Sequence, residues 1–547
     1  MTSAGKASLD LPCVTGTAVF ASAAAAEPGA AFRRSNEGRN KIIACAVVLL
    51  VLVIGFWPSF EKEASQMDEG SLLVYPEMLQ REKLPYRDFE TFYAPANPAV
   101  LAATYSLLGT NIFVERAVGL LYRLLILLAI FVIVQRWGKT LAAGCLFLSG
   151  CLLLVTYLPA FAWFGAMACA LWSIYLGRRA DSPMHCFFAG ALAGGALLYR
   201  VDIGPAIIIS ALPLLYGMSW PGRWRYLFGA AIALLPLVLV TLFAGWQPVL
   251  DNLFLTPALH SGPARHFPLF SVEPYLLNLF FAHLIAGGLN VTAGITTARS
   301  PSRDGRAVLL LSVALFGLGL TFQPAQRLDL IHLLFAAFVS LGFLPLSLSI
   351  LWSRFRSVAP KMGEKLLATI VVIAMLQAIA PELTNMVRTC FAAALHARAE
   401  ATFAERNGRS FPFGSPREAE IVAKMLAKLN ALSAPGDRLF VGPADLRRTN
   451  YNDTYLYHMM PELTPATYYL EMNPLSANRP GPRLAADVQS ADWLVLNRSY
   501  DFWTEPNRSS EYASNFPNII MQRDFEVCGE FGRYLLGRRR SRASHLH

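Results

Sequence analysis

Apolar runs separated by short polar connections fill the first two-thirds of the chain, and the last third has no comparable runs. A helix needs about 20 mostly apolar residues to cross the hydrocarbon core of a membrane, so each run predicts a membrane-spanning or re-entrant helix. The pattern predicts about eleven crossings, at residues 42–58, 112–134, 140–157, 160–176, 185–199, 203–218, 227–245, 275–297, 307–321, 330–352 and 366–381. We therefore expect an α-helical polytopic membrane protein.

Beyond Pro381 the sequence becomes polar and the predicted elements become shorter. The spacing of apolar and turn-forming residues predicts helices at 418–432 and 484–490, strands at 438–441 and 493–496, and a hairpin within 519–538. These elements predict a small α/β domain. We therefore expect three parts, which are a disordered tail at 1–40, a transmembrane domain at 41–382 with a long loop at 59–110, and an α/β domain at 383–547.

Composition supports a membrane location and argues against nucleic acid as a partner. Hydrophobic residues make up 54% of the chain and charged residues only 15%, which lies outside the range of ordinary soluble domains. The net charge is +10, but the basic residues are spread through short loops instead of clustering on one face. The eight cysteines show no CxxC or Cys/His spacing that would predict a metal cluster.

The distribution of Lys and Arg predicts the orientation of the chain, because cytoplasmic loops are enriched in these residues. Alternate connections carry nearly all of them, at 33–41, 136–139, 178–179, 223–225, 299–306 and 354–365. This pattern puts the N-terminal tail in the cytoplasm and, after an odd number of crossings, the C-terminal domain outside the cell. We expect a multi-pass protein of the plasma (inner) membrane.

The same alternation assigns the polar segments most suited to chemistry to the outer face. They are the loop 59–97, the turn 200–202, the loop 246–274 and the turn 322–329.

The first outer loop holds the acidic candidates Asp68, Glu69 and Asp88. Asp68 follows the first predicted span closely, so its carboxylate is expected near the level where a lipid-linked substrate presents its phosphate. A carboxylate there can act as a general base toward an attacking hydroxyl. Alternatively, Asp68 and Glu69 only cap the helix expected at 71–80, where negative charge favours the N-terminus.

Arg200 and Asp202 flank a tight turn between two short apolar segments. Charges this close to hydrocarbon are costly unless they are paired or functional. The two residues can pair with each other in a structural role. Otherwise Arg200 can contact a substrate phosphate and Asp202 a substrate hydroxyl.

Arg327, Asp329 and His332 form the next polar group. Asp329 and His332 are three residues apart and share one helix face, so a hydrogen bond between them is feasible. His332 can instead be merely interfacial. Arg327 suits phosphate, because a planar guanidinium binds two of its oxygens at once. Arg265, in the loop 246–274, is a further phosphate-binding candidate or a snorkelling charge.

Three of these segments together resemble the GT-C superfamily of membrane glycosyltransferases, which includes protein O-mannosyltransferases and aminoarabinose transferases. The likeness covers about residues 42 to 350. It is carried by Asp68-Glu69-Gly70 with Leu84-Pro85-Tyr86-Arg87-Asp88, Tyr93-Ala94-Pro95, Gly109 and Arg116, then by Tyr199-Arg200-Val201-Asp202-Ile203-Gly204, and then by Arg327-Leu328-Asp329-Leu330-Ile331-His332. The sequence departs from the superfamily at Ala94, where many relatives carry glycine before proline.

The resemblance implies an inverting transfer of a sugar from a polyprenyl-phosphate donor. An acidic residue of the first outer loop is required in the superfamily, which maps to Asp68 with Glu69 beside it, and Asp88 is the nearest match to a second one. We expect Arg200, Arg265 and Arg327 to bind the donor phosphate, supported by Asp202, Asp329 and His332. Some members use a divalent cation, so a Mg²⁺-type ion is a candidate cofactor with its ligands left open. The acceptor would be an envelope glycan, lipid or protein.

Two other classes of function fit part of the pattern. A transporter or flippase of a lipid-linked or anionic substrate would also place charges near broken helices, but along a central pathway at mid-membrane. An envelope scaffold with a polymer-binding C-terminal domain would explain Asn450-Tyr451-Asn452-Asp453 and the tyrosines at 455, 457, 468 and 469. That scaffold would leave the acidic first loop without a role.

Overall fold

The structure is a computed structural model that describes residues 53–179, 182–260, 272–299, 305–357, 402–449, 451–479, 483–499 and 513–540, with isolated positions at 362–363, 366, 380, 384 and 481. The chain divides into two units, Met1–Val47 and Val48–His547, and every described residue belongs to the second. The predicted tail at 1–40, the predicted phosphate ligand Arg265 and nearly all of the predicted span 366–381 lie outside the described residues.

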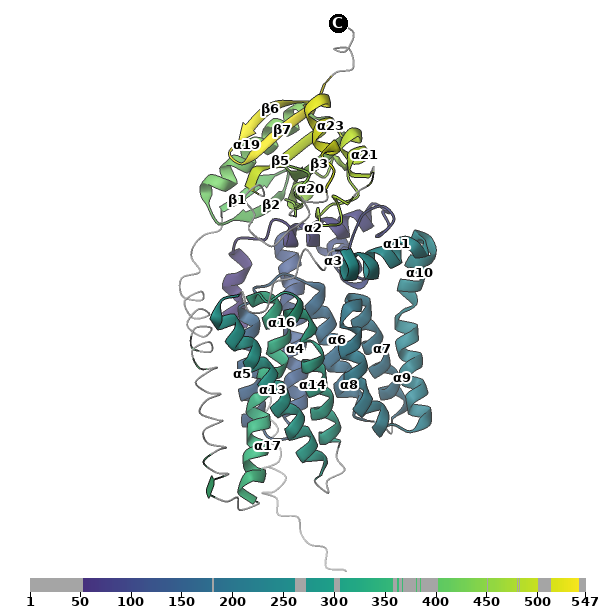
Figure 1. Cartoon of the computed structure of the whole chain (residues 1–547), viewed down its shortest axis with the longest axis vertical. Helices are drawn as coiled ribbons and strands as arrows, with labels where there is room; N and C mark the ends of the chain where they lie inside the picture. Colours follow the sequence, from purple (N-terminus) through teal and green to yellow (C-terminus); the bar gives the residue numbers. More distant parts are fainter. Residues whose placement is uncertain are drawn as a thin grey trace, which may run out of the picture. The chain divides into compact units, whose positions relative to one another are not determined.

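Helices form the part of the chain between residues 57 and 357 (Figure 1). They are η1 (Trp57–Glu61), α2 (Asp68–Gln80), α3 (Ala96–Leu108), α4 (Ile112–Val134), α5 (Lys139–Leu154), α6 (Ala162–Gly177), α7 (Pro183–Tyr199), η2 (Val201–Ile203), α8 (Gly204–Gly217), α9 (Trp220–Ala233), α10 (Leu235–Ala244), α11 (Trp246–Leu250), η3 (Asp251–His260), α13 (Pro274–Ala298), α14 (Arg306–Gly319), α15 (Phe322–Gln326), α16 (Leu330–Gly342) and α17 (Leu344–Ser357).

The predicted spans agree with these helices over most of their length. Each span predicted between residues 112 and 352 falls on a helix or on two consecutive helices. Five stretches in the described part are long and apolar enough to cross a membrane, and four apolar helices are shorter. The count of eleven crossings stays a prediction, because 42–58 and 366–381 lie largely outside the described residues.

The core of the helical part holds large aromatic side chains close to Arg200. Trp163 of α6 is fully buried, stacks on Phe335 of α16 with ring centroids 5.4 Å apart, and donates its indole N–H to the Phe335 carbonyl oxygen at 3.0 Å. A buried indole N–H needs such a partner. The contact fixes α6 against α16, and the guanidinium of Arg200 lies 5.1 Å from the Trp163 ring.

The long loop predicted at 59–110 contains two helices, α2 and α3. The predicted helix at 71–80 is confirmed and begins earlier, at Asp68. Helix α3 buries Leu101 and Tyr105 and exposes Leu107 and Leu108 on another face. A helix with an exposed apolar face is suited to lie at a membrane interface.

The C-terminal part is an α/β domain, as predicted (Figure 1). Its central sheet has the strand order β4-β3-β5-β7-β6, in which β3 pairs in parallel with β4 and β5, and β7 pairs antiparallel with β5 and β6. The elements are β1 (Thr402–Arg406), β2 (Arg409–Phe413), α19 (Pro416–Leu432), β3 (Arg438–Pro443), α20 (Tyr455–Met459), β4 (Thr464–Pro465), α21 (Arg483–Ser490), β5 (Trp493–Asn497), α23 (Phe516–Asp524), β6 (Phe525–Phe531) and β7 (Tyr534–Arg539).

Two details of this domain differ from the prediction. The expected hairpin within 519–538 is confined to β6 and β7, because α23 occupies the start of that segment. The hairpin β1–β2 was not predicted. Its turn, Asn407-Gly408, has φ values of 48° and 76°, and an Asn-Gly pair is a strong hairpin signal that could have revealed it.

Candidate active site

A cavity of about 650 Å³ gathers residues from six separate parts of the chain. We name it the Asp68 cavity. Its walls come from the start of α2, the loop before α3, the turn after α7, the helix η3, the segment from α15 into α16, and the C-terminal domain. Its titratable and amide side chains include those of Asp68, Arg200, Asp202, Gln323, Arg327, His332, Glu471 and Asn473.

Asp68 is the first residue of α2 and lines this cavity. Its carboxylate accepts a hydrogen bond from the Ser65 hydroxyl at 3.0 Å, and the Asp68 backbone N–H donates to the Ser65 hydroxyl oxygen at 3.1 Å. Burial raises the pKa of Asp68 to about 6, with a smaller upward contribution from the negative charge of Glu471 and a downward one from the Ser65 hydrogen bond. The pKa of this carboxylate therefore lies closer to neutral pH than that of an ordinary aspartate, which suits a general base.

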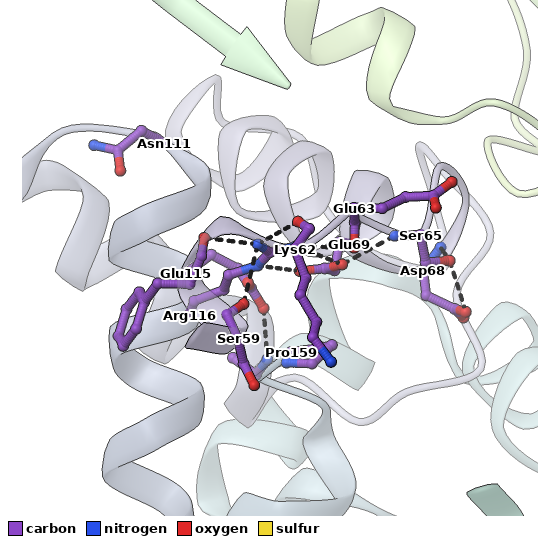
Figure 2. Close-up of polar contacts among 12 residues, drawn as sticks. Ser59, Lys62, Glu63, Ser65, Asp68, Glu69, Asn111, Glu115, Arg116 and Pro159 are labelled. Carbon is purple, nitrogen blue, oxygen red and sulfur yellow. Dashed lines mark hydrogen bonds and ion pairs between the residues drawn. The ribbon is translucent and has the colours of Figure 1, made fainter. Parts of the chain in front are cut away.

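Glu69 points away from Asp68, toward a buried arginine (Figure 2). Its carboxylate binds Arg116 of α4 through both oxygens, with Nε–Oε1 and Nη2–Oε2 distances of 2.7 and 3.1 Å. Both side chains are almost completely buried, and Ser65 donates its backbone N–H to Glu69 at 2.9 Å. Glu69 is not among the residues that line the Asp68 cavity.

Arg116 also donates hydrogen bonds to the backbone of the segment that leads into α2 (Figure 2). Its Nη1 donates to the carbonyl oxygens of Phe60 and Lys62, each at 2.8 Å, and to that of Ser59 at 3.3 Å. The ion pair with Glu69 thus fixes the entry into α2. Because consecutive helical side chains point in different directions, holding Glu69 on Arg116 turns Asp68 toward the cavity.

The carboxylates of Asp68 and Glu69 do not cap α2 through hydrogen bonds. Among the described residues, the two carboxylates accept hydrogen bonds from Ser65 and Arg116, and α2 has no side-chain cap hydrogen bond at its N-terminus. Their charges still lie at the positive end of the helix, where they are favourable.

Arg200 and Asp202 pair with each other and also face the cavity. The Arg200 Nε donates to Asp202 Oδ1 at 2.9 Å, Nη2 donates to Oδ2, and Gln323 donates to Oδ2 at 2.8 Å. The guanidinium lies 5.5 Å from the Tyr93 ring and 5.1 Å from the Trp163 ring. The aromatic rings and the Asp202 carboxylate hold the Arg200 guanidinium in place on the cavity lining.

Arg327, Asp329 and His332 form a connected group, in which the spacing had indicated only the contact between Asp329 and His332. The Arg327 Nε donates to Asp329 Oδ2 at 2.8 Å, and His332 Nδ1 lies 2.8 and 2.9 Å from the two Asp329 oxygens. Asp329 also caps α16 by accepting from the His332 backbone N–H at 2.9 Å. Arg327 and His332 line the cavity, whereas Asp329 acts from behind them.

Asp88 lies apart from this group. Its carboxylate pairs with the half-exposed Arg87 at 2.9 Å and accepts from the Leu84 N–H at 2.7 Å. The Arg87 hydrogen bond holds the pKa of Asp88 below its ordinary value. Asp88 does not line the Asp68 cavity, and Arg265 lies outside the described residues.

The C-terminal domain supplies three cavity residues that the sequence did not single out for this role, namely Tyr451, Glu471 and Asn473. The Tyr451 hydroxyl accepts from Arg327 Nη1 at 3.4 Å, and Asn473 donates to Glu471 at 3.0 Å. Tyr451 belongs to an aromatic and amide cluster visible in the sequence. Glu471 and Asn473 carry no such signal, because their position depends on how the domain packs.

Helix α2 is the element that joins this domain to the acidic loop. Its Glu77 binds Arg409 of β2 at 2.6 Å and His458 of α20 at 2.9 Å. At Gly70 the backbones touch so closely that an added Cβ would lie 2.4 Å from the Tyr455 nitrogen. The residue two positions from Asp68 must therefore be glycine for the domain to pack here.

Gly70→Ala is expected to destabilise the protein by about 1–3 kcal/mol, the usual cost of overpacking, because the methyl group meets backbone instead of a movable side chain. Thermal unfolding in one detergent measures the effect. The matched control is Gly144→Ala in α5, where an added Cβ meets nothing within 4 Å. Equal stability of the two variants would contradict this view of the α2 contact.

The chain is similar in fold to two crystal structures of ArnT, the aminoarabinose transferase, from Cupriavidus metallidurans. The structure bound to undecaprenyl phosphate aligns with a TM-score of 0.54 and 14% identity over 91% of this chain and 97% of that one. The apo structure aligns with a TM-score of 0.51 and 15% identity over 92% and 98%. ArnT is a GT-C glycosyltransferase. This chain has the GT-C fold.

An Archaeoglobus fulgidus oligosaccharyltransferase, solved in complex with zinc and sulfate, aligns with a TM-score of 0.40 and 12% identity over 84% of this chain and 67% of that one. No protein-family model and no curated protein matches the sequence. The two ArnT alignments confirm the expected GT-C resemblance for the fold, and the apolar helices agree with an integral membrane protein.

A divalent cation is the cofactor that the GT-C resemblance implies. Among the described residues, no group of three or more His, Cys, Asp or Glu side chains is arranged to hold a metal ion. Asp68 and Glu471 both line the cavity, and one or two carboxylates suffice for Mg²⁺ when water and substrate phosphate complete its shell. The cation stays a prediction.

Proposed function

We propose that this protein is a glycosyltransferase that moves a sugar from a polyprenyl-phosphate donor to an envelope acceptor at the outer face of the membrane. One observation carries the proposal. A single cavity combines a carboxylate whose pKa is about 6, Asp68, with the guanidinium groups of Arg200 and Arg327. A general base and phosphate-binding cations are the two kinds of group that transfer from a sugar phosphate needs.

The donor phosphate would bind between Arg200 and Arg327, each of which is held in place by its own aspartate. Asp68 takes the proton from the acceptor hydroxyl as its oxygen bonds to the anomeric carbon. The bond from that carbon to the phosphate oxygen breaks, and polyprenyl phosphate leaves with the electron pair. The two arginines offset the charge that grows on this leaving group. Attack opposite the leaving group inverts the anomeric configuration.

The remaining predicted residues receive supporting roles. Asp202, which accepts from Gln323 and faces the cavity, can also accept a hydroxyl of the donor sugar. Asp329 and His332 hold Arg327 and the cavity wall. We assign Glu69 to positioning, because its carboxylate is committed to Arg116. We assign Asp88 to the outer loop, because it pairs with Arg87 away from the cavity.

A transporter or flippase is the alternative function, and it calls for charges along a path through the helices. The ionisable residues of the Asp68 cavity instead come from loops, helix ends and the C-terminal domain. This arrangement favours chemistry near one surface over passage across the membrane.

The test is to incubate the purified protein, in lipid vesicles, with a panel of polyprenyl-phosphate sugars and a crude envelope acceptor. Release of polyprenyl phosphate from at least one donor is expected, and it should depend on the acceptor. Movement of a labelled donor lipid across the vesicle membrane without its consumption would favour the transporter. Consumption of no donor and movement of none would contradict both functions.

A further inference from the structure

A second cavity, of about 360 Å³, lies behind one wall of the Asp68 cavity. Asn473, which lines the Asp68 cavity, donates to Glu471 at 3.0 Å and to Glu90 at 3.4 Å. Glu90 lines the second cavity, together with Ser476, whose hydroxyl donates to it. A layer of hydrogen-bonded polar side chains therefore separates the two cavities.

Charged side chains with unused hydrogen-bonding groups line the second cavity. Within the part of the chain that the structure describes, the guanidinium groups of Arg479 and Arg483 donate no hydrogen bond, although that of Arg483 lies over the Tyr468 ring, and the carboxylate of Asp251 accepts none. Both arginines are exposed. Arg87 lies on the same lining, but its guanidinium is paired with Asp88. The exposed guanidinium groups of Arg479 and Arg483 offer several N–H donors to an anionic ligand.

Two aromatic rings complete the lining. The Tyr468 and Tyr469 ring centroids lie 5.2 Å apart, with the rings nearly perpendicular, and the Arg483 guanidinium lies 3.7 Å from the Tyr468 centroid. The Tyr468 hydroxyl donates to the Tyr86 carbonyl at 2.7 Å and accepts from the Asn252 amide at 2.9 Å. This ring is therefore held rigidly among the first outer loop, η3 and the C-terminal domain.

We propose that the second cavity is a binding site for an anionic saccharide. The two tyrosine rings can cover the apolar face of a sugar, the Asp251 and Glu90 carboxylates can accept its hydroxyls, and Arg479 and Arg483 can bind its phosphate or carboxylate. Because a layer of polar side chains separates this site from the Asp68 cavity, the saccharide would be a part of the acceptor adjacent to the unit that receives the sugar. That last assignment rests on the proposed function, whereas the binding chemistry does not.

The test is a titration of the full-length protein in lipid nanodiscs with glucose 1-phosphate, glucose and inorganic phosphate, followed by saturation-transfer NMR. Glucose 1-phosphate is expected to bind about tenfold more tightly than either of the others, because only it uses both the rings and the guanidinium groups. The double variant Arg479→Gln/Arg483→Gln should lose about tenfold in affinity. The control is Arg447→Gln, an exposed arginine of the same domain that pairs with Asp445, and it should bind as the parent does.

Several results would overturn the site. If inorganic phosphate bound as tightly as glucose 1-phosphate, the site would not recognise a saccharide. If glucose bound as tightly as glucose 1-phosphate, the site would not recognise an anion. Loss of binding in Arg327→Gln but not in the double variant would place the probe in the Asp68 cavity. Binding does not need turnover, so Asp68→Asn should bind the probe normally. A protein that consumes no donor yet binds the probe through Arg479 and Arg483 would refute the proposed function and keep this site.

Discussion

Asp68→Asn is expected to lower sugar transfer roughly 10²- to 10⁴-fold, the usual contribution of a general base. Asparagine has the shape of aspartate and can still accept the Ser65 hydroxyl, so the start of α2 should keep its structure. The measurement is release of polyprenyl phosphate from the active donor, with kcat and KM determined separately. The loss should appear in kcat, because Arg200 and Arg327 remain to bind the donor phosphate.

Glu82→Gln serves as the control for this substitution. Glu82 is an exposed acid of the same outer loop and does not line the Asp68 cavity. Its substitution should leave turnover unchanged within the error of the assay. Undiminished turnover in Asp68→Asn would refute the assignment of the base.

The pH dependence follows from the raised pKa of Asp68. The base works only when ionised, so kcat/KM should rise as pH increases through about 6 and then level off. Burial is the largest cause of the raised pKa, and Glu471 adds to it. Glu471→Gln removes a neighbouring negative charge, stabilises the ionised form of Asp68, and should move the midpoint to lower pH. A midpoint that stays in place or moves upward would contradict the electrostatic coupling of these two acids.

Arg116→Met is expected to destabilise the protein by about 3–5 kcal/mol, the cost of leaving one partner of a buried ion pair without compensation. The substitution leaves the Glu69 carboxylate, which is 3% exposed, without its Arg116 ion pair. It also removes the hydrogen bonds from Arg116 to the carbonyl oxygens of Phe60 and Lys62. Equilibrium unfolding in mixed micelles measures the change. Turnover should also fall, because the entry into α2 no longer fixes the direction of Asp68.

The double variant Glu69→Gln/Arg116→Met separates charge from packing. It removes the buried charge as well, so it should be more stable than Arg116→Met alone. An exposed pair gives the scale for comparison. Arg447→Gln, which breaks the contact with Asp445, should change stability by no more than about 1 kcal/mol. A similarly small effect of Arg116→Met would show that the buried pair does not hold α2.

Much of the local structure could be predicted from the sequence. The apolar run 112–134 coincides with α4, and the polar pattern of the last third revealed α19, β3, α21 and β5. These elements depend on side-chain periodicity and on the length of a membrane span, both of which are local properties of the chain. The hairpin β1–β2 was missed although its Asn407-Gly408 turn is also a local signal.

Part of the candidate site could be predicted as well. Assigning alternate loops to one face grouped Asp68 with Arg200, Asp202, Arg327 and His332, and the Asp68 cavity contains all five side chains. The rule works across long stretches because each helix that crosses a membrane reverses the side on which the chain emerges.

The sequence by itself thus determined most of the helices, several of the strands, and which charged residues gather around Asp68. Only the tertiary structure decided that the adjacent acids differ, with Asp68 open to the cavity and Glu69 bound to Arg116. It also brought Glu471 and Asn473 to Asp68 from the C-terminal domain. The physical reason is that helix phase and domain packing depend on contacts between residues far apart in the chain. A pattern of neighbouring residues does not record such contacts, so the direction of one carboxylate comes from the fold.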